Sequence, residues 1–174
     1  MNDIETLIYL GRQTFIETYK NMGEGRPEGL EEIYGRETFN YDKLLPILSA
    51  AEEDQTQPLF YIAWIENTPA GFMKLEFDLP IESVPDRTSV HFSQAYLLRP
   101  FQGKGLGRSL LDEAKSQAKT RNRTGLWLGV WDQNKAAIEF YKKMGFKKVG
   151  TTEWKFTHGA INYTDIDDVM YLGL

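Results

Sequence analysis

The sequence predicts a mixed α/β (α+β) domain in which helices pack against a central sheet. Two observations lead to this fold class. The first third of the chain has the apolar spacing of amphipathic helices, whereas short runs of aromatic and branched residues begin after Pro58. From there strand-like and helix-like segments alternate, and no repeat or linker divides the chain. We therefore expect a single domain over residues 1–174.

Three helices are expected in the N-terminal third. Apolar residues recur at helical spacing over 3–20, and the segment GEGRPEG interrupts the pattern. Pro27 suits the first turn of a second helix, and Asn40 can cap a third helix that tolerates Pro46. Three strands then follow as a meander: LFYIAWI and FMKLEFDL are joined by the turn ENTPAG, and SVHFSQAYLL comes next.

The remaining segments alternate between helix and strand. A helical pattern follows the glycine-rich QGKGLGR, and GLWLGVW (125–131) has the composition of a buried strand. Asp132 or Asn134 can cap the next helix, which Gly145 is expected to end in the left-handed conformation. The segments FKKVGTTEWKFTHG and INYTDIDDVMYLGL predict two final strands around a turn.

Composition excludes several classes of protein. The net charge of −5, from 20 basic and 25 acidic residues, argues against a general nucleic-acid binder. Without cysteine there is no disulfide, thiolate zinc site or cysteine nucleophile, and His91 and His158 are too far apart in sequence to suggest a metal site. We find no signal peptide and no long apolar run, so we expect a cytoplasmic protein without a membrane segment.

Residues 102–107 read Gln-Gly-Lys-Gly-Leu-Gly and lie at a strand-to-helix junction. The glycines allow positive φ angles, so that backbone N–H groups can converge, and the helix dipole adds to their attraction for anions. Lys104 and Arg108 supply positive charge. The pattern is neither a Walker A loop nor a Rossmann fingerprint. It suits a phosphate or pyrophosphate, although a glycine-rich turn without a ligand has the same pattern.

This loop, with the apolar strand before it and the helix R-x-L-L-x-x-A after it, resembles the acetyl-CoA signature of the GNAT N-acetyltransferase superfamily. Further on, the strand Trp127–Trp131, Asn134 and the sequence F-Y-x-x-x-G-F from Phe140 resemble the second signature of the family. The resemblance extends strongly over residues 58–174 and loosely over the N-terminal helices. The amino-acid sequence of this second segment is most similar to that of the PaiA-like spermine/spermidine acetyltransferase branch.

The resemblance implies a mostly antiparallel sheet with flanking helices, in which the two central strands splay apart to admit acetyl-CoA. Unpaired backbone groups at the splay need partners, and those of Ala95, Tyr96 and Leu97 would bind the pantetheine arm. The pyrophosphate would lie against the loop residues Gln102, Gly103, Lys104, Gly105, Leu106, Gly107 and Arg108. Asn134 would bind the cofactor arm, a role that can coexist with capping a helix. Lys143 would reach a CoA phosphate, although an exposed lysine beside Lys142 is more often simply solvated.

Tyr141 matches the family residue that protonates the departing CoA thiolate. A phenol suits this role because its pKa, about 10, lies close to that of a thiol. The alternative is a core aromatic residue on the same helix face as Ile138 and Met144.

The resemblance does not supply the general base. Many relatives carry Glu at the positions that are Ser93 and Gly129 here. His91 lies on the same strand face as Ser93, and imidazole titrates in the range that amine deprotonation requires. His91 is therefore the candidate base and Glu76 the second, although a structural histidine fits equally. Family members also start with a strand, whereas this chain starts almost directly with a helix.

The leading hypothesis is direct transfer of acetyl from acetyl-CoA to a polyamine or another small amine, since no acetyl-cysteine intermediate is available. Acidic residues on the N-terminal helices would attract such an acceptor, although a solvated acidic face is equally consistent: Glu17, Glu24, Glu28, Glu31 and Glu32. Aromatic residues could pack against it: Phe15, Tyr19, Tyr34 and Trp154. Alternatives are acetylation of a protein N-terminus or lysine, and a non-catalytic acyl-CoA-binding module. Exposed terminal strands would allow a homodimer.

Overall fold

The computed structural model describes residues 3–20, 27–53 and 58–174. It confirms the predicted mixed fold of helices and strands. The helices are α1 (Asp3–Tyr19), α2 (Leu30–Thr38), α3 (Tyr41–Glu53), α4 (Leu106–Thr120), α5 (Lys135–Lys143) and the short 3₁₀ helix η1 (Arg99–Phe101). The strands are β1 (Leu59–Ile65), β2 (Thr68–Glu76), β3 (Val90–Leu97), β4 (Gly125–Trp131), β5 (Lys147–His158) and β6 (Ile161–Gly173). In the described part of the chain no strand precedes α1.

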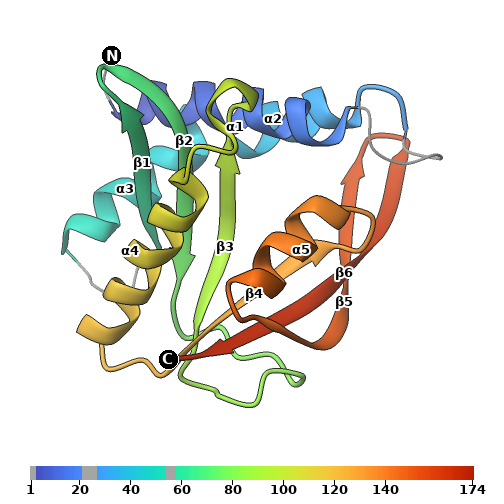
Figure 1. The fold of residues 1–174 in the computed structure, drawn as a ribbon. Helices are drawn as coiled ribbons and strands as arrows, with labels where there is room; N and C mark the ends of the chain where they lie inside the picture. The colour runs from blue at the N-terminus through green and yellow to red at the C-terminus, as the bar shows by residue number, and fades with distance from the viewer. Residues whose placement is uncertain (1–2, 21–26, 54–57) are drawn as a thin grey trace.

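The six strands form one sheet in the order β1-β2-β3-β4-β6-β5, antiparallel except between β3 and β4. The parallel pair β3–β4 is hydrogen-bonded only at Val90 with Leu126 and His91 with Trp127. Beyond these two residues of each strand, β3 and β4 diverge toward α1 and α5 (Figure 1). The splayed central strands expected from the sequence are therefore present.

A β-bulge interrupts β3 close to this divergence. Lys74 of β2 pairs with Gln94, whereas the next residue, Leu75, pairs with Phe92, so Ser93 has no partner on β2. Such bulges bend a strand and change the direction of its side chains. The alternation of β3 is consequently broken at Ser93, a feature that the sequence did not predict.

Two layers of helices enclose the sheet (Figure 1). Adjacent residues of β2 point to opposite layers, with Met73 on the side of α4 and α5 and Phe72 on the side of α1 and α3. The first core includes Met73, Leu75, Phe92, Leu110, Leu111, Ala114 and Ile138, and the second includes Leu7, Leu10, Phe39, Leu44 and Phe72. Burial of these apolar side chains is the main force that fixes both layers to the sheet.

Short-range sequence signals set several helix ends. The Oδ1 atom of Asn40 accepts a hydrogen bond from the Lys43 N–H at 3.0 Å, and Gly145 follows α5 with a φ angle of 97°. Asn134, and not Asp132, caps α5 by accepting from the Ala137 N–H at 3.2 Å. The expected start of α2 is wrong, because Pro27 lies before the helix, which begins at Leu30.

No helix within the described ranges is both long enough and apolar enough to span a bilayer.

Candidate active site

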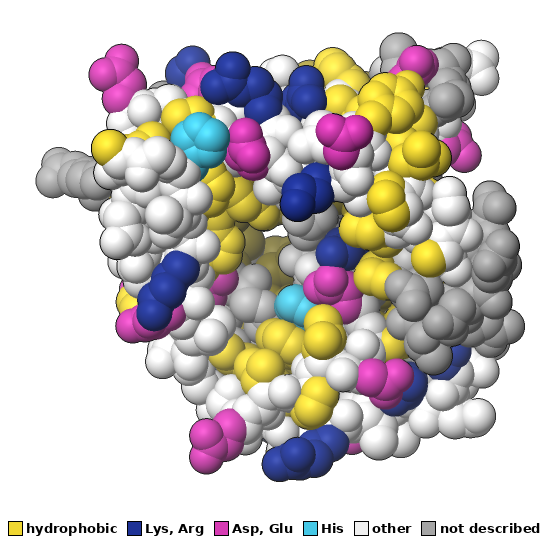
Figure 2. Space-filling view, turned by 180° about the vertical axis from the view of Figure 1, so that it is seen from behind, with side chains coloured by type: hydrophobic (Ala, Val, Ile, Leu, Met, Phe, Trp, Pro, Cys, Tyr) yellow, Lys and Arg dark blue, Asp and Glu magenta, His cyan; other side chains and the backbone are white. Residues whose placement is uncertain are grey.

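A cavity of about 280 Å³ lies where β3 and β4 separate. Its walls come from α1, α2 and the strands β3 to β6, so that segments far apart in the sequence meet in it. On the face opposite to Figure 1, the molecule is hollowed near its centre, with hydrophobic side chains in and around the hollow (Figure 2). The lining residues are Phe15, Tyr19, Tyr34, His91, Ser93, Gln94, Tyr96, Trp127, Gly129, Trp131, Thr152, Glu153, Trp154, Asp165 and Asp167.

The predicted pantetheine-binding segment borders the splay. Ala95, Tyr96 and Leu97 pair with β2 on one side, and none of them pairs with β4 on the other. A ligand that enters the gap can therefore satisfy backbone groups that the sheet leaves unpaired. The Leu97 carbonyl already accepts a hydrogen bond from Gln102 Nε2 at 2.9 Å, which ties the glycine-rich loop to the end of β3.

The glycine-rich loop has the conformation that an anion site needs. Gly103 and Gly105 have φ angles of 73° and 87°, and the space over both is open. Gly105 precedes α4 and no side chain caps the helix, so the first N–H groups of α4 lack a side-chain partner. Lys104 and Arg108 are exposed at the same end. The loop residues thus fit a diphosphate such as that of CoA.

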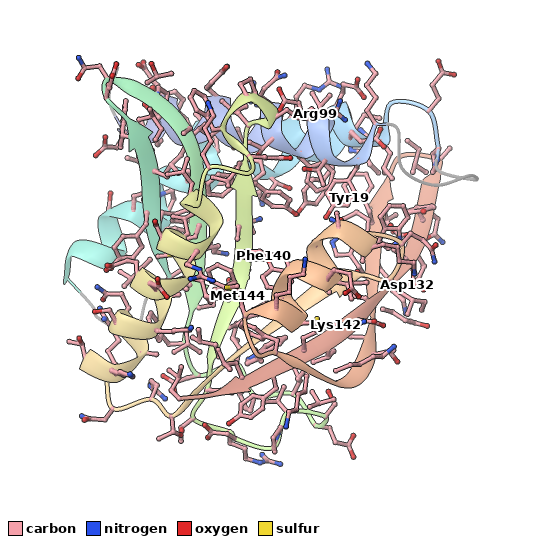
Figure 3. The ribbon with its side chains drawn as sticks, viewed as in Figure 1. Tyr19, Arg99, Asp132, Phe140, Lys142 and Met144 are labelled. Carbon is pink, nitrogen blue, oxygen red and sulfur yellow. The ribbon has the colours of Figure 1, made fainter. Side chains whose placement is uncertain are left out.

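Two contacts hold this loop in place. Phe140 of α5 extends toward the start of α4 (Figure 3), and its Cζ lies 3.3 Å from the position of a Cβ on Gly107. Arg99, just before the loop, is fixed to α1, because its N–H donates to Glu17 Oε2 at 2.8 Å and its Nη2 donates to the Glu17 carbonyl at 2.7 Å. Glu17 therefore anchors the loop and is not part of the cavity wall.

The other acidic residues expected to attract an acceptor do not line the cavity either. Glu24 lies outside the described residues, and Glu31 is buried within α2. Glu28 is exposed, and Glu32 forms an exposed ion pair with Lys20 at 3.4 Å. The acidic residues of the wall are instead on the C-terminal hairpin: Glu153, Asp165 and Asp167. Sequence reasoning missed them, since nothing local shows which face of β6 turns inward.

The four expected aromatic residues do line the cavity. Phe15 stacks on Tyr34 with ring centroids 4.1 Å apart, and Tyr34 meets Trp154 edge-on at 5.3 Å. Tyr19 extends from α1 to within 5.9 Å of the Trp131 ring (Figure 3), and its hydroxyl lies 3.2 Å from that of Tyr96. Aromatic rings contributed by both ends of the chain therefore surround the space.

His91 lies at the closed end of the splay and contributes to the cavity wall. Its ring stacks on Trp127, with centroids 3.7 Å apart and an interplanar angle of 4°. Its Nδ1 lies 3.1 Å from Glu76 Oε2. The stacking on Trp127 restricts the imidazole plane, and the Glu76 carboxylate lies beside Nδ1.

Glu76 is a poor candidate for the base. Burial alone would raise the pKa of its carboxyl, but contacts with His91, Lys74 and Ser93 outweigh burial and lower the pKa to about 2. Lys74 Nζ is 2.6 Å from Glu76 Oε1. The carboxylate is therefore charged at neutral pH and serves to orient His91.

The residues contributed by α5 lie outside the cavity lining. Tyr141 packs against the core beside Phe92 and Phe146, as the structural alternative predicted, and burial together with the nearby Tyr19 raises the pKa of its phenol. Asn134 serves as the helix cap and Lys143 is exposed.

Comparison with known proteins identifies the family. The model of the acetyltransferase (GNAT) family matches residues 27–146. An uncharacterized N-acetyltransferase from Lactobacillus delbrueckii subsp. lactis is 29% identical over 163 residues, which cover 94% of this chain and 88% of that protein. Spermidine N(1)-acetyltransferase from Thermoplasma acidophilum is 28% identical over 147 residues, covering 84% of each chain.

The structure is also similar to the crystal structure of PaiA N-acetyltransferase from Thermoplasma acidophilum in complex with coenzyme A. The TM-score is 0.74 at 27% identity, and the match covers 99% of this chain and 93% of the other. The chain thus belongs to the GNAT acetyltransferase family. The predicted superfamily, its similarity to PaiA, the fold class and the assignment as an N-acetyltransferase are confirmed.

We predict that Glu76→Gln makes stability depend less on pH. Because the folded-state pKa of Glu76 is lowered from 4.5 to about 2, its charge stabilises the fold above the unfolded-state pKa, and this contribution is lost as the pH falls toward 2. Its full size is about 3 kcal/mol. Urea unfolding should show that the difference in unfolding free energy between wild type and Glu76→Gln is about 2 kcal/mol smaller at pH 3 than at pH 7. The exposed Glu139→Gln is the control, and an equal gap at both pH values would contradict the prediction.

We predict that Gly105→Ala raises the KM for acetyl-CoA. A side chain at a φ angle of 87° costs about 1–2 kcal/mol and displaces the N–H groups at the start of α4. Gly159→Ala is the matched control, because Gly159 also has a positive φ of 57° but lies in the β5–β6 turn. Equal KM values for the two variants in a steady-state assay would count against the loop as the diphosphate site.

Proposed function

We propose that this GNAT enzyme transfers acetyl from acetyl-CoA to a primary amine of a small, multiply charged acceptor, with polyamines as the leading class. The observation that carries this proposal is the chemistry of the cavity at the splay. Its lining contains three carboxylates and no lysine or arginine among the described residues. Its remaining walls are mostly aromatic.

This environment favours cations over neutral or anionic acceptors. Carboxylates that line a concave site raise the local concentration of positively charged molecules. Indole and phenol rings attract ammonium groups through their π faces and also pack against methylene chains. The similarity to a spermidine N(1)-acetyltransferase supports the same class of acceptor.

The donor would enter from the other side of the sheet. When bound, acetyl-CoA supplies the activated acetyl group. The backbone of Ala95 to Leu97 would bind its arm, and the loop from Gln102 to Arg108, together with the α4 N-terminus, would hold its diphosphate. Coenzyme A in the similar Thermoplasma structure supports this donor.

Proton transfers are assigned to two side chains. His91, oriented by Glu76 and Trp127, would take the proton that the acceptor ammonium must lose, and Nε2 would be the atom that receives it. The Tyr141 phenol would donate a proton to the CoA sulfur, although burial raises its pKa and makes it a weaker acid than a free phenol. For each ammonium acetylated, one proton ends on the thiol and one reaches solvent.

The proposal is tested by measuring CoA thiol release with purified protein, acetyl-CoA and a panel of acceptors. We expect turnover with spermidine or a short diamine, and at least tenfold lower kcat/KM with a lysine-containing peptide. Preference for the peptide would favour a protein acetyltransferase. Tight acetyl-CoA binding without turnover on any acceptor would favour a non-catalytic module.

His91→Ala is expected to lower kcat/KM by about 100-fold or more, because the acceptor amine loses its base. The limb of the pH–rate profile in which the rate rises with pH should change shape. His158→Ala is the control, since this second histidine is exposed on β5, 3.9 Å from Glu37. An unchanged profile and kcat/KM in His91→Ala would exclude His91 as the base.

A further inference from the structure

The face of β4 that lines the cavity contains a gap between two indoles. Trp127, Gly129 and Trp131 are two residues apart and therefore share one face of the strand, and all three line the cavity. With no side chain on Gly129, the space between Trp127 and Trp131 is left to a group from another strand.

Asp167 of β6 fills this space. Its Oδ2 lies 3.2 Å from the position that a Cβ on Gly129 would occupy. In the sheet Asp167 pairs with Trp131, so its side chain reaches back along β4 toward Gly129. The carboxylate is half-buried and is a member of the cavity lining.

The surroundings of Asp167 make this part of the cavity negative. Asp165 and Glu153 line the same space, and His91 is its one basic lining residue within the described ranges. Burial raises the pKa of the Tyr34 phenol, and the charges of Glu76 and Asp167 add to this rise. A cationic group beside Asp167 would gain from both the carboxylate and the indole faces.

The spacing along β4 separates this carboxylate from the candidate base. His91 pairs with Trp127, and Gly129 lies two residues further along the strand. Two residues of a β-strand span about 7 Å. A chain of three or four methylene groups between two nitrogens bridges a distance of this order.

We infer that Asp167 determines specificity by binding a second ammonium group of the acceptor while the nitrogen to be acetylated lies at His91. The acceptor class is then a diamine or polyamine with a short methylene spacer. This inference rests on the proposed function, and it assigns acceptor selection to one carboxylate.

The test compares a diamine with a monoamine of the same chain length in Asp167→Asn. We expect the KM for putrescine or spermidine to rise by about 10- to 100-fold, the loss expected for one charged hydrogen bond. The KM for acetyl-CoA should stay within about twofold, and the KM for butylamine should rise much less than that for the diamine, because butylamine has no second ammonium group. Asp168→Asn is the matched control. Asp168 is the next residue of β6, but it forms an ion pair with Lys148 and does not line the cavity.

Moving the carboxylate from position 167 to position 129 distinguishes the loss of a negative charge from general damage to the fold. Asp167→Ala should weaken diamine use as Asp167→Asn does, and adding Gly129→Asp should restore most of the loss. The φ angle of Gly129 is not positive, so an aspartate can be placed there without backbone strain. Removing the Asp167 carboxylate clears the space that the new side chain at position 129 would need. Rescue by the double variant is not expected if Asp167 acts only through packing.

Calorimetry of spermidine binding to the CoA-loaded protein gives a readout that needs no turnover. Weaker binding in Asp167→Asn, but not in Asp168→Asn, supports the inference. The inference would be overturned if Asp167→Asn raised the KM for the diamine and the monoamine equally, or if it left the affinity for spermidine unchanged. If wild type binds spermidine through Asp167 but acetylates no amine, the proposed function fails while the ammonium site stands.

Discussion

Strands β3 and β4 are joined by only two residue pairs, and this short pairing shapes the rest of the site. Their early separation leaves a row of backbone N–H and C=O groups without ladder partners. An isolated buried group of this kind costs about 1–3 kcal/mol, so a sheet keeps such an opening only where something else can satisfy the groups. The bulge at Ser93 and the side-chain-free Gly129 lie just beyond the last pair.

The opening separates two chemically different regions. On the side of α4 and α5, positive φ glycines, exposed cations and an uncapped helix start suit the phosphates of a nucleotide. The cavity on the other side combines aromatic rings from α1 and α2 with carboxylates from the β5–β6 hairpin. Glu17 links the two, since it lies on α1 and holds the backbone just before the glycine-rich loop.

Features set by local chemistry could be predicted from the sequence. Asn40, Asn134 and Gly145 act within one helix turn, and the glycine-rich loop is contiguous in the chain. The acidic wall could not be predicted in this way. Asp167 reaches the cavity through pairing between distant strands, whereas Glu17 was expected at the acceptor but is used by Arg99. The bulge at Ser93 also depends on the register with β2, which no local pattern fixes.

The central claim is that the splay receives coenzyme A while the cavity beyond it receives the amine. Amide hydrogen exchange tests this most directly, with coenzyme A added first and spermidine second. We predict that coenzyme A slows exchange over residues 92–97 and 103–108, and that spermidine adds protection over 127–131 and 165–167. Exchange around Gly159 in the β5–β6 turn should not change. Protection confined to segments outside the splay, or no further change on adding spermidine, would contradict the account.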